Sequence, residues 1–403
     1  MTRSLRRALI AVAICACAVL SLSSTALAIE EFPATGSPSG VTAGPDGAIW
    51  FTEETANRIG RMTTGGLLTT EFNIPTANSL PSEIVAGPDG SLWFTEYSGN
   101  KIGRITTSGA ITEFTVPGGG APDGIVVGPD GNLWFTENTS NQIGRITTAG
   151  SITEFDLPTA NGPGDITVGP DSRLWFTASD PSNPTTSTNH KIGAITLGGG
   201  ISEYGIPTAG SDPSGITSTG GALWFTEHLK NQIGRISTTG VVTNEFPAGS
   251  GEPSGIATGR DGAIYYTETG PSRIGRMTAS GSITNEFTLT PGSAPGAIAP
   301  GPDGNLWFAE FAGNRIGRIA VAAPFIPPPP PLAVTPQATS NKKKCKVPKL
   351  RGLNVKKARR KLKRAKCKYR IRGKGRFSSS KPKAGRTTSG TVIVKFKAKK
   401  ARR

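Results

Sequence analysis

The sequence has few of the residues that most often carry out enzyme chemistry. Its 403 residues include four cysteines, three methionines and two histidines, His190 and His228. No group of Cys and His has the spacing of a zinc site. A nucleophile elbow and a phosphate-binding glycine loop are also missing. These absences exclude the sequence motifs of zinc enzymes, α/β-hydrolases and P-loop proteins.

Acidic residues are absent from both ends of the chain. Residues 341–403 hold 28 Lys and Arg without any Asp or Glu, whereas residues 29–340 have a net charge of −14. Such an asymmetry predicts an anionic partner for residues 342–403. We expect an anionic cell-envelope polymer, and no physiological nucleic acid. The alternative is a solvated basic surface without a specific partner.

Long apolar runs are confined to the N-terminus. Arg3, Arg6 and Arg7 precede an apolar stretch at residues 8–22, and an Ala-Leu-Ala sequence ends at Ala28. This pattern is typical of a secretory signal peptide, with a retained membrane anchor as the alternative. We therefore expect a secreted, extracytoplasmic and cell-wall associated protein. Outside the cytoplasm, Cys345 and Cys367 predict one disulfide.

One phrase repeats through the middle of the chain. A core of the form hydrophobic-Trp-Phe-Thr-Glu followed by Ile-Gly-Arg recurs seven times, at steps of 43, 41, 41, 49, 41 and 42 residues. The slot holds all six tryptophans and Tyr265. A period near 40 with several short strands per unit indicates a β-propeller. Because each unit has one aromatic residue in this slot, we predict that these residues form the core between blades.

The sequence predicts an all-β fold, a seven-bladed β-propeller of four-stranded blades. The seventh unit lacks its fourth strand, and residues 29–35 supply a matching segment, so we expect the N-terminal strand to close the ring. The predicted domains are a signal peptide at 1–28, the propeller at 29–320, a proline-rich linker at 321–341 and a basic domain at 342–403. We expect a monomer.

The basic domain is predicted to be a small α+β unit with βαββ order. Strands are expected at residues 345–350, 367–372 and 391–398, and a helix at 354–366. The motifs VPKLRG, KPKAG and TVIV resemble a PASTA domain, a module of bacterial envelope proteins often associated with peptidoglycan. Where that module usually has acidic and neutral surface residues, this chain has Lys and Arg.

The repeat itself resembles a known family. Residues 128–159 read GPDGNLWFTENTSNQIGRITTAGSITEFDLPT, and this wording is similar to the streptogramin B lyases, also called virginiamycin B lyases. The resemblance covers residues 29–319. It implies a seven-bladed propeller and a magnesium-dependent elimination that opens cyclic depsipeptide antibiotics. It also implies two histidines in Pro-His-x-Ile turns, which none of the seven corresponding turns here contains.

The remaining site candidates are residues that differ between repeats. His228 directly follows a strand-end Glu and is the general-base candidate. Glu252 and Glu268 correspond in placement to the family's metal-holding acids, so the resemblance implies a possible Mg²⁺ site there. Six second strands end in Glu, either as a ring around a ligand face or as architecture. The insertion at residues 178–189, closed by His190, is a lid candidate or a tolerated surface loop.

Three functions remain open at this stage. The first is a binding protein with a degenerate catalytic site, which takes a small ligand or peptide on the propeller face and is held near the envelope by its basic tail. The second is a magnesium-dependent carbon–oxygen lyase of the virginiamycin B type. The third is a structural or adhesive envelope protein.

Overall fold

The computed structural model describes residues 28–159, 161–249, 251–321, 345–350 and 353–365, and the backbone of strands between 369 and 397. The chain divides into two compact units, residues 1–325 and 326–403. The predicted signal peptide, most of the linker and Cys367 lie outside the described residues. The disulfide of Cys345 and Cys367 therefore stays a prediction.

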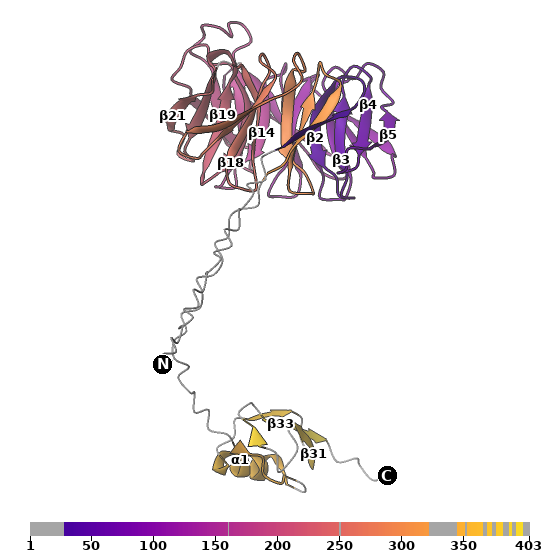
Figure 1. Ribbon diagram of the computed structural model, residues 1–403, viewed down its shortest axis with the longest axis vertical. Helices are drawn as coiled ribbons and strands as arrows, with labels where there is room; N and C mark the ends of the chain where they lie inside the picture. Colours follow the sequence, from indigo (N-terminus) through magenta and orange to yellow (C-terminus); the bar gives the residue numbers. More distant parts are fainter. Residues whose placement is uncertain are drawn as a thin grey trace, which may run out of the picture. The chain divides into compact units, whose positions relative to one another are not determined.

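The first unit is a seven-bladed β-propeller, as predicted. Its strands form seven four-stranded antiparallel sheets, and blades one to six each use four consecutive strands, beginning with β2 to β5. Figure 1 shows these four strands following one another from the middle of the ring outward. We number the blades in chain order from β2.

Each blade has an inner, a second, a third and an outer strand. The inner strands are β2 (Pro38–Ala43), β6 (Pro81–Ala86), β10 (Pro122–Val127), β14 (Gly162–Val168), β18 (Pro213–Thr219), β22 (Pro253–Thr258) and β26 (Pro295–Pro300). The second strands are β3 (Ile49–Glu53), β7 (Leu92–Glu96), β11 (Leu133–Glu137), β15 (Leu174–Ser179), β19 (Ala222–Glu227), β23 (Ile264–Glu268) and β27 (Leu306–Glu310). The third strands are β4 (Arg58–Met62), β8 (Lys101–Ile105), β12 (Gln142–Ile146), β16 (Lys191–Ile195), β20 (Gln232–Ile236), β24 (Arg273–Met277) and β28 (Arg315–Ile319). The outer strands are β5 (Leu68–Asn73), β9 (Ile111–Thr115), β13 (Ile152–Asp156), β17 (Ile201–Gly205), β21 (Val242–Pro247), β25 (Ile283–Thr288) and β1 (Ile29–Pro33).

The N-terminal strand closes the ring, which confirms the prediction from the incomplete seventh repeat. β1 pairs antiparallel with β28, from Ile29 opposite Ile319 to Pro33 opposite Arg315. The ring of Phe32 then stacks on Trp307, with the centroids 5.6 Å apart. The closure hides backbone groups of β28 that would otherwise form an exposed sheet edge.

The repeated aromatic residues form the core between blades. Every Trp of the repeat, together with Tyr265, is at most 1% exposed. Trp134, for example, stacks on Phe155 of the outer strand and packs in one cluster with Ile166 of the next blade. The Gly of Ile-Gly-Arg is needed because a Cβ on Gly144 would collide with the ring of Phe135. The prediction that these aromatics are core residues is confirmed.

The described part of the C-terminal unit contains the helix α1 (Val355–Arg364) and short strands. Asn354 caps the helix by accepting a hydrogen bond from Lys357 N, and Ala358 and Leu362 are its buried residues. The strands are β29 (Cys345–Lys346), β30 (Tyr369–Arg372), β31 (Arg376–Lys381), β32 (Thr387–Thr388) and β33 (Val392–Lys397).

These strands extend the predicted βαββ order. β33 pairs in parallel with β30 and antiparallel with β31, and β29 pairs with β32. The sequence analysis did not predict β31 and β32. Their segments are rich in Ser, Thr and Lys and lack a run of apolar alternation, so their pairing with other strands outweighs weak local preference. Among the described residues of the whole chain, no helix is both long and apolar enough to cross a membrane.

Candidate functional site

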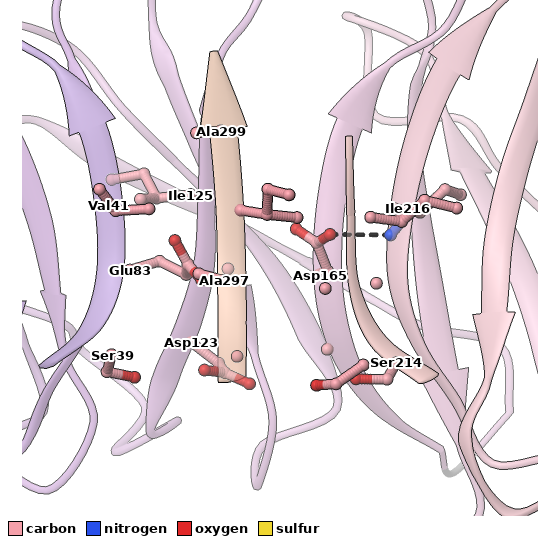
Figure 2. A pocket seen from close by; sticks show the side chains of 18 of the residues that line it. Ser39, Val41, Glu83, Asp123, Ile125, Asp165, Ser214, Ile216, Ala297 and Ala299 are labelled. Carbon is pink, nitrogen blue, oxygen red and sulfur yellow. Dashed lines mark hydrogen bonds between the residues drawn. The ribbon is translucent and has the colours of Figure 1, made fainter. Parts of the chain in front are cut away.

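A cavity of about 880 Å³ lies at the centre of the propeller, and the inner strands of all seven blades line it. Figure 2 shows its layers: Ser39, Asp123 and Ser214 lie at one level, Glu83 and Asp165 at the next, and apolar side chains beyond them. One end of the cavity is therefore polar, and the other is apolar. A concave site with a few polar groups over an apolar floor is typical of small-ligand binding.

A bulge in each inner strand turns these side chains toward the cavity. In blade three, Pro122 pairs with Glu137 and Ile125 with Phe135, so the inner strand has one extra residue between two pairs. The second-strand Thr136 supports the bulge, because its Oγ1 accepts a hydrogen bond from Gly124 N at 2.9 Å. The same bulge occurs in the other six blades.

Three carboxyl groups break the seven-fold pattern inside the cavity. Glu83, Asp123 and Asp165 come from the bulges of blades two, three and four. Asp123 accepts a hydrogen bond from Ser82 Oγ at 2.7 Å. Asp165 accepts from Ile166 N at 2.7 Å and from Ile216 N at 2.8 Å, across to the next inner strand. The last bond is the dashed line in Figure 2.

Burial raises the pKa values of all three groups, and neighbouring carboxylate charge adds to the shift of Glu83 and Asp165. Burial, followed by the charges of Asp165 and Asp123, raises the pKa of Glu83 to about 8. Burial raises the pKa of Asp165 to about 7 against the effect of its two backbone hydrogen bonds, and burial also raises the pKa of Asp123. The cavity therefore retains protons at neutral pH that a bound cation would displace.

The structure places His228 at the cavity. The residue begins the 3-10 turn η1 (His228–Lys230) directly after β19, and it lines the cavity together with Asn138 and Asp212. Its Nδ1 lies 3.3 Å from the carbonyl oxygen of Pro253. A carbonyl oxygen only accepts, so Nδ1 carries the proton and Nε2 keeps its lone pair. This tautomer is suited to proton abstraction at Nε2.

Glu252 and Glu268 do not line the cavity. Glu268 is fully buried, and its Oε2 lies 2.9 Å from Nε of Arg273, which neutralises it. Glu252 is exposed and has a left-handed backbone, with φ of 52°. This arrangement fits a magnesium ion poorly. Within the part of the chain that the structure describes, no group of three or more His, Cys, Asp or Glu is placed to hold a metal.

The six strand-end glutamates, of which Glu268 is one, all lie inside the blades. The set is fully buried and lies away from the cavity lining: Glu53, Glu96, Glu137, Glu227, Glu268 and Glu310. Of the two interpretations that the sequence left open, their burial favours architecture over a ring around a ligand.

His190 belongs to the insertion, not to the cavity. The side chain is 1% exposed, its Nδ1 lies 3.3 Å from Asp180 N and its Nε2 lies 3.1 Å from Pro184 O. Both ring nitrogens thus hold the insertion in shape, which favours a structural role for this histidine.

The three cavity carboxylates were not among the site residues predicted from the sequence. The Pro-x-y-Ile turns were notable there for the histidines that they lack. The signal was in the same turns: Glu83 and Asp165 stand where four other repeats have Gly, and Asp123 stands where the others have Ser or Gly. A charged residue that replaces a small one in a single repeat has no architectural reason to be there.

Comparison with solved structures supports the same family. A streptogramin B lyase structure is 37% identical, covers 73% of this chain and 98% of that chain, and has a TM-score of 0.67. A catalytically inactive variant of virginiamycin B lyase from Staphylococcus aureus, crystallised with quinupristin, is 37% identical, with coverage of 73% and 100% and a TM-score of 0.65.

A more distant structure shares only the fold. Hydrazine synthase of Kuenenia stuttgartiensis is 17% identical, covers 72% of this chain and 96% of that chain, and has a TM-score of 0.62. No curated protein matches the sequence. The family model described as Virginiamycin B lyase family matches residues 20–184 and 183–325. Because this match spans the whole propeller, the chain belongs to the virginiamycin B lyase family.

Proposed function

We propose that the protein is a secreted ligand-binding protein whose central cavity takes a small molecule or a short peptide. The observation that carries this proposal is the set of side chains after the first Pro of each inner-strand turn. They are Ser39, Ser82, Asp123, Gly164, Ser214, Ser254 and Gly296. None is a histidine, although the cavity of the fold is present. The site thus has room for a ligand without the two bases that the family resemblance predicts.

The cavity carboxylates give this site a preference for positive charge. Three carboxyl groups from Glu83, Asp123 and Asp165 face one space, and two of them have pKa values near neutrality. A ligand with an ammonium group would stabilise their ionised forms. Binding of such a ligand should therefore strengthen as the pH rises from about 6 to about 8, with release of protons.

A second candidate is a carbon–oxygen lyase that acts on cyclic depsipeptides. His228 favours it, because Nε2 retains a lone pair at the edge of the cavity while Nδ1–H is held by Pro253 O. In this role Nε2 would accept the proton next to the ester. Magnesium would supply stabilisation of the resulting negative charge, but Glu252 and Glu268 fit that ion poorly, so we assign no ligands to it.

One experiment separates the two candidates. Quinupristin is incubated with the purified full chain, with and without Mg²⁺, and followed by mass spectrometry and calorimetry. We expect binding without conversion. A ring-opened product that disappears in His228→Ala would establish the lyase instead. If quinupristin is neither bound nor converted, both functions are excluded for this antibiotic.

A cavity-filling variant makes the binding test specific. An ideal Cβ on Gly296 meets no atom within 4 Å, and Gly296 lines the cavity, so Gly296→Phe projects into the space without a backbone clash. We expect affinity to fall at least about tenfold with the melting temperature unchanged. Retained affinity in this variant would place the ligand elsewhere.

The proposal also assigns the basic tail, residues 342–403, to an anionic polymer of the cell envelope. Its net charge of +28 and the export signal predicted at residues 1–28 support this role. The PASTA-like motifs agree with an envelope location. The protein would then act as a monomer held near the cell wall.

A further inference from the structure

Each blade except blade four brings two glutamate carboxyl groups together, and the one from the second strand is fully buried. One comes from the end of the second strand and the other from the outer strand. The pairs are Glu53 with Glu71, Glu96 with Glu113, Glu137 with Glu154, Glu227 with Glu245, Glu268 with Glu286, and Glu310 with Glu31. In blade four, Ala178 replaces the first member.

Four of these six pairs contain a built-in cation. It is the first residue of the third strand, namely Arg58, Lys101, Arg273 or Arg315. In blade six, Arg273 lies 2.9 Å from Glu268 and 3.5 Å from Glu286, so one guanidinium contacts both carboxylates. Two carboxylates in contact, one of them buried, repel each other and destabilise the fold unless a positive charge or a proton offsets the repulsion.

Blade five lacks this cation. Gln232 occupies the position of Arg273, opposite Glu227 in the sheet. Glu227 is fully buried, and no donor within the described residues reaches either of its carboxylate oxygens. Its carboxyl group meets that of Glu245, and the Oε1 of Gln232 is also buried without a donor. Two side chains, Glu227 and Gln232, thus leave oxygen atoms unpartnered beside the carboxyl group of Glu245.

Blade three has the same substitution but gives donors to both of its glutamates, and only Glu137 Oε1, among their described buried oxygens, is left without one. Gln142 stands at the cation position, and its Nε2 donates to Asp156 Oδ1 at 2.8 Å. The Oγ of Ser140 donates to Glu137 at 2.9 Å, and Gly118 N donates to Glu154 at 3.2 Å. In blade five the residue opposite Gln232 is Pro247, which offers no comparable side-chain acceptor. The unpartnered oxygens therefore do not follow from the glutamine alone.

We propose that blade five binds a calcium ion between Glu227, Glu245 and the Oε1 of Gln232. The ligands are all hard oxygens, and two carboxylates match the charge of one divalent ion. Calcium is favoured over magnesium because it accepts irregular oxygen shells at about 2.3–2.6 Å and gives up its water more readily. Gln232 is partly exposed, which provides a path from solvent. This ion would neutralise the glutamate pair of blade five, as Arg273 neutralises that of blade six.

A proton is the competing occupant. Burial, followed by the charge of Glu245, raises the pKa of Glu227 to about 8. The third strand contributes only the uncharged Gln232 at this position, and Glu245 also accepts a hydrogen bond from Thr208 N at 3.2 Å. Calcium and a proton compete for the same carboxylate oxygens, so calcium should bind more weakly as the pH falls.

Thermal unfolding of the full chain tests the site. The protein is freed of divalent ions with a chelator and then titrated with CaCl₂ at pH 8. We expect the melting temperature to rise by about 4 °C once calcium exceeds its dissociation constant about a hundredfold. Magnesium should give a smaller rise. Equilibrium dialysis of the unmodified chain should find one calcium ion per chain.

Variants locate the ion. Gln232→Arg rebuilds the arrangement of blade six and should abolish the calcium response. Gln142→Arg, the same change in blade three, should retain it, and so should Glu83→Gln in the central cavity. If calcium neither raises the melting temperature of the unmodified chain nor binds to it, the proposal is overturned and the pair holds a proton instead. A full response in Gln232→Arg would also overturn it. The result does not depend on which ligand the cavity takes.

Discussion

At the residue scale, the two members of a glutamate pair can differ in pKa, so that one keeps its proton while the other is ionised. In blade two, Glu113 accepts from Thr76 N, Thr76 Oγ1 and Lys101 Nζ, each at 2.9 Å. Burial opposes its ionisation, but these bonds lower the pKa of Glu113 overall. Burial, with the charge of Glu113, raises the pKa of Glu96 to about 8. Glu96 is therefore the protonated member of the pair at neutral pH.

The proton on Glu96 makes stability depend on pH. The unfolded side chain ionises near pH 4.5, whereas the folded one holds its proton to about pH 8. The folded state binds more protons in this interval, so this contribution is fully present below about pH 4.5 and is lost as the pH rises toward 8. Glu96→Gln keeps a donor without the titration. From pH 5 to pH 8 we expect the free energy of unfolding of the variant to rise by about 3 kcal/mol relative to that of the unmodified chain.

Urea unfolding at the two pH values measures this difference. Glu113→Gln is the control, because it removes the ionised partner and should destabilise the protein at both pH values. If the difference in free energy of unfolding between Glu96→Gln and the unmodified chain stays constant with pH, then Glu96 is already ionised in the folded state.

At the element scale, the threonine of the repeated Trp-Phe-Thr-Glu joins each blade to the next. Thr136 Oγ1 accepts from Gly124 N in its own blade and donates to Gly164 O in the following inner strand at 2.6 Å. Equivalent threonines in the other blades from one to six make the same two bonds, and blade seven has Ala309 instead. The threonine thus maintains the bulges that direct side chains into the cavity.

Removing one such hydroxyl should be costly. Thr136→Val preserves shape but leaves a buried N–H and a buried carbonyl without their partner, so we expect a loss of about 2 kcal/mol in the free energy of unfolding. Thr115→Val, on an exposed position of an outer strand, is the control and should change it by less than about 0.5 kcal/mol. Equal values for the two variants would contradict the role of the hydroxyl.

At the scale of the whole molecule, charge is strongly divided between an acidic propeller and a basic tail. The envelope proposal predicts that the full chain binds purified cell walls, and that its affinity falls at least about tenfold between 50 and 200 mM salt, because each neutralised anion releases counterions. Four exposed basic residues of α1 offer a matched variant, in which Lys356, Lys357, Arg359 and Arg360 become Gln. This variant should show a shallower dependence on salt. Binding that is indifferent to salt would contradict an electrostatic tail.

The sequence by itself determined the architecture. Residues that recur in six or all seven blades, such as Trp134, Thr136 and Gly144, occupy the same environment each time, so their period reports the fold directly. The missing last strand likewise predicted closure by residues 29–35, and β1 (Ile29–Pro33) closes the ring. The sequence also singled out His228, which the structure places at the cavity.

Only the tertiary structure decided which unique residues meet. Glu83, Asp123 and Asp165 belong to three different repeats, and they share a cavity because bulges turn them inward and the ring curves them together. The same holds for Glu268, whose strand-end position resembles a cavity rim but whose side chain lies against Arg273 inside its blade. The pattern of the sequence shows which residues repeat from blade to blade. The direction of a side chain and its distant neighbours depend on the closed ring, which no single repeat contains.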